Sequence, residues 1–326
     1  MGCARAVGRK WFDLLLCGAV AAVPVGLKLP ASALLGRVVR PDNGSADADD
    51  MLGGDNGAAR LFLASQNGHC EVVVALLRAG AAVNQADTGT GQTPLLIASQ
   101  NGHCEVVAAL LAAGAAVNQA KTANGATPLL VASQKGHCEV VAALLGAGAA
   151  VNQAMPDDGA TPLFMASMWS RTDVVAALLG AGAAVNQATT DDGATPLYMA
   201  SQDGHCDVVK VLLGAGAAVN QAMTDDMGAT PLFVASQEGH CEVVAALLGA
   251  GAAVNQATTD SGATPLFVAS DNGHCEAVVA LLGAGAAVNQ ARTNDGATPL
   301  FIASRNGHCD VVALLRAALA RRMGDP

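Results

Sequence analysis

Short apolar runs alternate with polar and glycine-rich stretches in a fixed order along most of the chain. In residues 230–263, Thr230 and Pro231 precede the apolar run Leu-Phe-Val-Ala. A threonine hydroxyl can cap the start of a helix, and proline suits the first helical position because no amide donor is required there. Gly239 then interrupts the run, since glycine favours the conformation that ends a helix. The pattern therefore predicts a short helix that begins after Thr230 and stops at Gly239.

A second apolar run in the same unit has the spacing of a helix with one broad buried face. Its apolar positions lie at i, i+1, i+4 and i+5, at Val243, Val244, Leu247 and Leu248. His240 begins this predicted helix, and the Gly-Ala-Gly that follows the run ends it. Residues 252–263 have the turn chemistry of a loop or short hairpin. The unit is thus helix, turn, helix and protruding loop.

The unit recurs along the chain. Successive copies of Thr-Pro-Leu are 34 residues apart, with one step of 35, at Thr93, Thr127, Thr161, Thr195, Thr230, Thr264 and Thr298. A period between about 20 and 50 residues is typical of a solenoid, in which each unit buries its apolar face only against its neighbours. The sequence predicts such an array over residues 58–322, with a tail at 323–326. Its eight repeats begin near residues 59, 93, 127, 161, 195, 230, 264 and 298.

The repeated residues resemble those of ankyrin repeats. The family pattern Gly-x-Thr-Pro-Leu-His, Ala-Ala, Gly-His, Val-Val, Leu-Leu-Leu and Gly-Ala-Asp-Val-Asn is matched closely in about four fifths of the chain. The resemblance implies an all-α ankyrin-repeat solenoid of helix-turn-helix units with protruding loops or short hairpins. It also implies a non-catalytic scaffold that binds a protein partner through its concave face and loop tips.

Two departures from the family pattern are uniform. The histidine after Thr-Pro-Leu is replaced by an apolar or aromatic residue, and the aspartate of Gly-Ala-Asp is alanine. The ends differ from the other repeats: Ala59 and Arg60 replace Thr-Pro at the start, and residues 314–322 extend the last helix with three arginines. A terminal repeat requires a polar outer face. These features predict caps and a monomeric array.

The charge distribution argues against one class of partner. Only 13% of residues are charged, against about 25% in ordinary soluble domains. The net charge is −10, and residues 1–40 carry six Lys/Arg against one acid, Asp13. The remainder is therefore strongly acidic. A phosphate backbone requires many Lys and Arg side chains, so we expect no nucleic-acid binding.

Histidine and cysteine are adjacent in seven repeats, at Cys70, Cys104, Cys138, Cys206, Cys241, Cys275 and Cys309. Neighbouring helical residues point about 100° apart, and a zinc site needs four ligands around one ion. Stacked helices lie ~8–10 Å apart, whereas a disulfide needs Cα atoms within ~7 Å. The pattern predicts structural histidines, free thiols and no metal site. Free thiols fit a reducing compartment, which favours a cytoplasmic location.

Acidic residues gather at the loop tips, in pairs at Asp157/Asp158, Asp191/Asp192 and Asp225/Asp226 and singly at Asp260 and Asp295. They lack the spacing and the distal Glu of a calcium loop. The pattern predicts solvated turn residues or recognition of a basic partner surface. No phosphate-binding glycine loop, nucleophile elbow or metalloprotease helix is present in the sequence. We expect no enzymatic activity and no cofactor.

Repeat four departs most from the others. It has Ser-Met-Trp-Ser-Arg-Thr where they have Ser-Gln-Asn-Gly-His-Cys or a close variant. By the resemblance, the two residues after the Ala-Ser pair lie on the concave face. An exposed Trp beside Met and Arg has the composition of an interface hot spot, although repeat decay or a ring lying flat on its neighbour would give the same sequence. The predicted partner-binding residues are Met168, Trp169, Arg171, Met155, Lys135, Asp203, Glu238, Asp271 and Arg305.

The N-terminal segment, residues 1–40, combines basic residues with an apolar run at 14–27 that is followed by Ala-Ser-Ala. This fits a secretory signal or anchor, an organellar transit peptide, or an extra cap helix. The run is too short for a transmembrane helix. Residues 41–57, acidic and glycine-rich, predict a flexible linker. The alternatives to a simple scaffold are thus a membrane- or organelle-targeted adaptor and a regulatory subunit of an enzyme complex, so membrane, secretory and organellar locations stay open.

Overall fold

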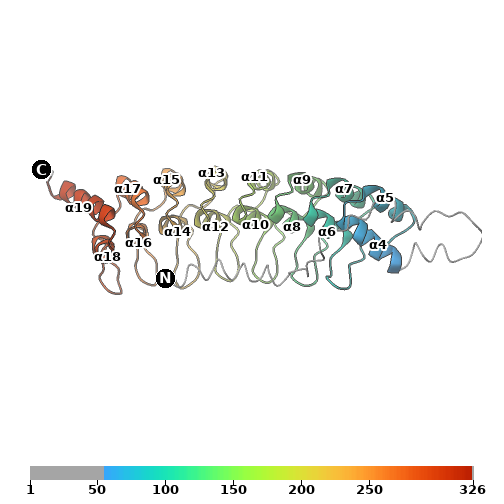
Figure 1. The fold of residues 1–326 in the computed structure, drawn as a ribbon, viewed down its shortest axis with the longest axis horizontal. Coiled ribbons are helices and arrows are strands. Elements are labelled where there is room, and N and C mark those ends of the chain that lie inside the picture. Colours follow the sequence, from blue (N-terminus) through green and yellow to red (C-terminus); the bar gives the residue numbers. More distant parts are fainter. Residues whose placement is uncertain (1–54, 325–326) are drawn as a thin grey trace, which may run out of the picture. The chain divides into compact units, whose positions relative to one another are not determined.

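The computed structural model describes residues 55–324, and the predictions for residues 1–40 and 41–54 lie outside this range. Within it, sixteen helices follow one another in eight pairs, and no β-strand is present. Figure 1 shows the pairs side by side in one row, with a loop between each pair and the next. The predicted all-α solenoid of helix-turn-helix units is confirmed, and its connections are loops rather than hairpins.

Each pair consists of an even-numbered and an odd-numbered helix. The even-numbered helices are α4 (Asp55–Gln66), α6 (Pro94–Asn101), α8 (Pro128–Lys135), α10 (Pro162–Met168), α12 (Pro196–Gln202), α14 (Pro231–Glu238), α16 (Pro265–Asn272) and α18 (Pro299–Arg305). The odd-numbered helices are α5 (Cys70–Arg78), α7 (Cys104–Ala112), α9 (Cys138–Gly146), α11 (Thr172–Gly180), α13 (Cys206–Gly214), α15 (Cys241–Gly249), α17 (Cys275–Gly283) and α19 (Cys309–Gly324). Helix α4 begins inside the segment assigned to the linker, and α19 ends inside the predicted tail. Among these helices, none is both long and apolar enough to cross a membrane.

The predicted caps fix the ends of the even-numbered helices. In α14, the N–H of Phe233 donates a hydrogen bond to Thr230 Oγ1 at 3.2 Å, and Pro231 holds the first helical position. The helix ends at Gly239, whose φ of 77° lies in the left-handed region that glycine adopts at little steric cost. The threonine cap recurs in every even-numbered helix after α4. The predicted start and stop of this helix are confirmed.

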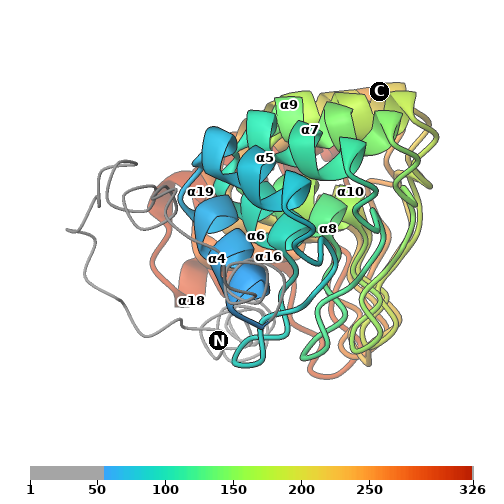
Figure 2. The same cartoon turned by 90° about the vertical axis from the view of Figure 1, so that its right-hand side faces the viewer.

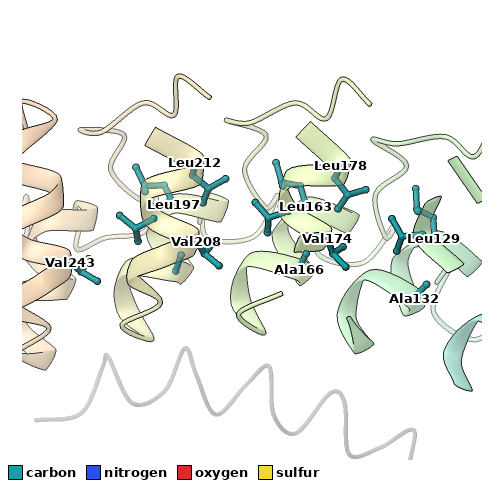
Figure 3. Packing of buried hydrophobic residues seen from close by; sticks show 14 of the residues in the cluster. Leu129, Ala132, Leu163, Ala166, Val174, Leu178, Leu197, Val208, Leu212 and Val243 are labelled. Carbon is teal, nitrogen blue, oxygen red and sulfur yellow. The ribbon is translucent and has the colours of Figure 1, made fainter. Parts of the chain in front are cut away.

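The core lies between the two layers of helices. Figure 2 shows the odd-numbered helices in one layer, the even-numbered helices beneath them and the loops gathered along one side. Leucine and valine side chains from both layers fill the space between them and are fully buried. Figure 3 shows the same arrangement in neighbouring repeats, with Leu163, Val174 and Leu178 followed by Leu197, Val208 and Leu212. One continuous core therefore runs through the array.

Two series of hydrogen bonds join each repeat to the next. His240 Nε2 lies 3.0 Å from the backbone oxygen of Gln202 in the preceding repeat, and five other histidines repeat this contact. In the second series, the N–H of Ala253 donates to Asn220 Oδ1 at 2.8 Å. This alanine stands where the family has aspartate, and it contributes only its backbone. The recurrent histidine therefore has the structural role that the sequence predicted. The recurrent asparagine has a structural role as well.

Each loop is closed by its own backbone and, in several repeats, tied to the loop before it. The N–H of Lys121 donates to Ala126 O at 2.8 Å, which closes one loop. The N–H of Thr190 donates to Asp158 O at 2.8 Å and so crosses to the preceding loop. The loop tips are therefore held in a defined order along the array.

The terminal repeats are only partly capped. Helix α19 is longer than the other odd-numbered helices, as predicted, and Arg322 Nη2 donates to Ala286 O of repeat seven at 2.9 Å. In the even-numbered layer the ends are not covered: Leu63 of α4 is 49% exposed and Phe301 of α18 is 55% exposed. Elsewhere in the array, a neighbouring repeat buries the residue equivalent to Leu63 or Phe301. At the two ends, no described residue takes the place of that neighbour.

Candidate functional site

One position in each repeat changes its chemical character while the cap and core positions stay nearly constant. It directly precedes the residue with a left-handed backbone that follows each even-numbered helix, a glycine in all repeats except repeat four. We call these eight residues the variable row: Asn67, Asn101, Lys135, Trp169, Asp203, Glu238, Asn272 and Asn306. Because the even-numbered helices pack side by side, the row follows the array along its length. Four of the nine predicted binding residues belong to it.

Asparagine members of the row take part in packing. Asn101 Nδ2 donates to Gln66 O of the preceding repeat at 2.9 Å. Lys135 and Asp203 are exposed, and within residues 55–324 neither side chain makes a hydrogen bond or an ion pair. These two charged side chains are therefore available to a partner, whereas Glu238 Oε1 accepts a hydrogen bond from Gln237 Nε2 at 3.0 Å and the asparagines are largely occupied by the fold.

Three more predicted residues directly precede members of the row. Met168 is half-buried, and its backbone oxygen lies 3.0 Å from His205 Nε2. Asp271 is half-buried as well, and its Oδ1 accepts a hydrogen bond from Asn306 Nδ2 at 2.7 Å. Arg305 is exposed in the last repeat. The structure thus places Met168 and Asp271 between repeats and Arg305 on the surface.

Trp169 is half-buried, which fits the alternative of a ring lying on its neighbour better than a fully exposed indole. A ring of this size gains more by covering apolar surface than by extending into water. Its Nε1 is buried and has no acceptor among the described residues. A buried donor without an acceptor costs about 1–3 kcal/mol. Repeat four therefore presents part of an indole face and holds a hydrogen-bond donor that its own fold does not satisfy.

Arg171 and Met155 have structural contacts that sequence reasoning missed. Arg171 replaces the recurrent histidine, and its Nε donates to Gln134 O at 3.2 Å, which continues the inter-repeat series. Met155 is half-buried, and its N–H donates to Ala160 O at 2.9 Å to close the loop before α10. The position of Arg171 in the repeat was the signal for its role, since seven other repeats have histidine there.

Acidic side chains occupy three successive repeats, at Asp203, Glu238 and Asp271. Desolvation raises the pKa of Asp203 even though its side chain is exposed, and the charge of Glu238 raises it further. His205 and His240 act in the opposite direction. The surroundings of Asp203 therefore disfavour its negative charge, and a cation placed beside it would relieve that effect.

The aspartates at the loop tips are not all solvated, and that prediction is wrong for Asp158. Asp158 is 8% exposed, and its Oδ1 accepts a hydrogen bond from the N–H of Ala160 at 2.8 Å. In the equivalent loop of the preceding repeat, Asn124 Oδ1 accepts from Ala126 in the same way. The side chain closes the turn, which explains its burial. Asp157 beside it is exposed.

Replacing Asp158 by asparagine is expected to stabilise the protein at neutral pH. Burial raises the pKa of Asp158, and the charges of Asp191 and Asp157 add to this. A raised folded-state pKa means that the group stabilises the fold fully below its ordinary pKa of 3.8 and that this contribution is lost as the pH rises through the folded-state value. Asparagine keeps the oxygen acceptor, as Asn124 does, without the charge.

The measurement is urea unfolding of wild type and Asp158→Asn at neutral pH and below pH 3.8. The advantage of the variant should shrink as the pH falls. Asp157→Asn is the matched control and should show a smaller advantage, because its carboxylate is exposed. A difference between wild type and Asp158→Asn that does not change with pH would contradict the assignment.

The recurrent His-Cys pairs do not converge on a metal-binding arrangement. The seven cysteines of the array carry free thiols in separate repeats. In residues 55–324, no three His, Cys, Asp or Glu side chains gather closely enough to hold a metal ion. Six of the histidines instead bridge repeats through Nε2.

Comparisons with known proteins agree with this geometry. A family model described as ankyrin repeats (3 copies) matches residues 61–155, 147–223, 183–258 and 235–321. Among solved structures, the crystal structure of the human ASB11 ankyrin repeat domain matches with a TM-score of 0.61 and 28% sequence identity. That match covers 72% of this chain and 100% of the ASB11 chain. The comparison with curated protein sequences found no match.

Proposed function

The chain belongs to the ankyrin repeat family, and on that premise we propose that it binds a protein partner through the variable row and the loop tips. Ankyrin repeats are generally protein–protein interaction modules, and the fold is typically non-catalytic. The observation that carries the proposal is the contrast between constant and variable positions. Caps, core and inter-repeat bonds are nearly identical in every repeat, whereas the row contains amide, cationic, aromatic and anionic side chains.

The centre of the proposed surface lies in repeats three to six. Trp169 supplies the exposed part of a half-buried aromatic ring. Lys135 lies on one side of it in the row, and Asp203 and Glu238 lie on the other. Aromatic side chains with polar tips are enriched where partners bind. The acidic pair favours a partner that places a basic side chain there, because a cation offsets the raised pKa of Asp203.

Affinity capture with the full chain tests this proposal. The test variant combines Met168→Gln, Trp169→Asn and Arg171→His, which restores the residues of the other repeats. Its fold is expected to persist, because histidine at position 171 can make the same bond to the Gln134 oxygen. Lys210→Ala is the matched control, since it also restores the common residue but lies exposed on α13 in the other layer.

We expect wild type and Lys210→Ala to capture the same partner. We expect the triple variant to bind it about tenfold or more weakly, because a hot-spot aromatic contributes about 2 kcal/mol or more. Equal binding by all three proteins would exclude repeat four as the contact. A wild-type chain that captures no partner would count against the binding function itself. The targeted-adaptor alternative depends on residues 1–40, and it stays a prediction, as does the regulatory subunit.

A further inference from the structure

Large exposed apolar side chains mark the two ends of the array. Among the described residues, three such side chains are strongly exposed: Leu63, Val279 and Phe301, at 49%, 53% and 55%. Val279 lies on α17, which has an odd-numbered helix on each side. Leu63 belongs to α4 in the first repeat, and Phe301 belongs to α18 in the last. Val279 is therefore exposed although its helix has neighbours on both sides, whereas Leu63 and Phe301 lie in the two terminal repeats.

Leu63 and Phe301 are exposed because each lacks one neighbouring repeat. The residues equivalent to Leu63 in later repeats are buried, for example Val234 at 1% and Ile302 at 1%. The residues equivalent to Phe301 in earlier repeats are buried too, for example Phe267 at 1%. The first position is therefore covered by a preceding repeat and the second by a following one. We call the surface around Leu63 the head and the surface around Phe301 the tail; they are the two halves of the contact that joins repeats within the array.

The polar contact between repeats is also incomplete at the head and the tail. Inside the array, a histidine Nε2 meets the backbone oxygen two residues before the left-handed position of the preceding repeat, as His308 meets Asp271 at 3.0 Å. At the head, the side chain of His69 has no such oxygen within the described residues. At the tail, the backbone oxygen of Arg305 has no histidine partner in the part of the chain that the structure describes. The unused groups are those that a neighbouring repeat would pair.

From this complementarity we propose that the head of one chain docks on the tail of a second copy. Helix α4 of one copy would lie against α18 of the other, with Leu63 covering Phe301 and His69 Nε2 bonded to the Arg305 oxygen. The contact lies in the even-numbered layer, because residues 318–324 extend α19 beyond the length of the other odd-numbered helices. A head-to-tail contact leaves one unused head and one unused tail on every dimer, so it can add further copies. This assembly replaces the monomeric array that the sequence predicted.

Sedimentation of the full chain over a range of concentrations tests the proposal. Wild type should show a mass that rises with concentration above the 32.3 kDa monomer, without a plateau at the dimer. Leu63→Glu removes the head and Phe301→Glu removes the tail, and each variant alone should stay monomeric. An equimolar mixture of the two should form dimers and nothing larger, because it contains one intact head and one intact tail. Val279→Glu is the matched control and should associate as wild type does.

Two outcomes would overturn the proposal. A wild-type chain that stays monomeric at every concentration would show that the head or the tail is covered otherwise, for instance by residues 1–54 of the same chain. Association of Leu63→Glu alone would show that two tails meet, and association of Phe301→Glu alone would show that two heads meet. If either variant associates alone, a dimer in the mixture of the two variants would no longer be evidence for a head-to-tail contact.

Discussion

Truncation of Leu178 to alanine is expected to lower the free energy of unfolding by about 2–5 kcal/mol. The side chain is 0% exposed and lies between α10 and α11 in the middle of the array. Figure 3 shows it beside Leu163 and Val174, which would line the resulting cavity. The loss has two parts, the transfer free energy of the removed carbons and the cavity that packed neighbours cannot fill. Equivalent leucines occupy this place in every repeat, so the change removes part of a continuous core.

Urea unfolding followed by circular dichroism measures this loss. Val279→Ala is the matched control, because Val279 is 53% exposed and its truncation should change stability by no more than about 0.5 kcal/mol. The unfolding transition of Leu178→Ala should also become less cooperative, since each repeat is stabilised chiefly by its neighbours and the change weakens a central one. Similar midpoints for the two variants would contradict the packing described for repeat four.

The fold followed from the sequence wherever its determinants are local. The threonine cap of α14 and the glycine that ends it act within one helix, and both are visible as residue types at fixed positions. The buried faces follow from apolar spacing alone. The period of the array then specifies how one helix pair meets the next. For these features a single repeat contains nearly all of the information.

The candidate site was predictable only in part, because several of its properties depend on neighbouring repeats. The bond of Arg171 to Gln134 joins residues 37 positions apart, and no pattern within one repeat reveals it. The exposure of Phe301 arises because its covering repeat is absent. Sequence variation identified the row as a candidate surface, but it could not separate side chains without contacts from side chains used in packing.

Gly204→Ala is expected to destabilise the protein by about 1–2 kcal/mol, because a residue with a Cβ is strained in the left-handed region. Gly204 has a φ of 74°, and a Cβ placed there would lie 2.7 Å from the ring of His240. That ring also makes the inter-repeat contact to the Gln202 oxygen at 3.0 Å. The substitution therefore strains the backbone and displaces a side chain that joins two repeats.

Repeat four allows the opposite substitution, because Ser170 occupies the position equivalent to Gly204 with a φ of 56°. The contact between His205 and Met168 persists beside it at 3.0 Å, so the ring can adjust and backbone strain is the larger effect. Ser170→Gly should consequently stabilise the protein by about 0.5–1 kcal/mol, once the greater freedom of glycine in the unfolded chain is subtracted. Gly180→Ala serves as the control: Gly180 ends helix α11 without a left-handed backbone and has open space around it, and the same chemical change should there stabilise by up to about 1 kcal/mol. The unfolding midpoints of the three variants test this prediction. If Gly180→Ala lost stability, or if Gly204→Ala lost none, backbone conformation would not explain why glycine occupies the left-handed positions of this array.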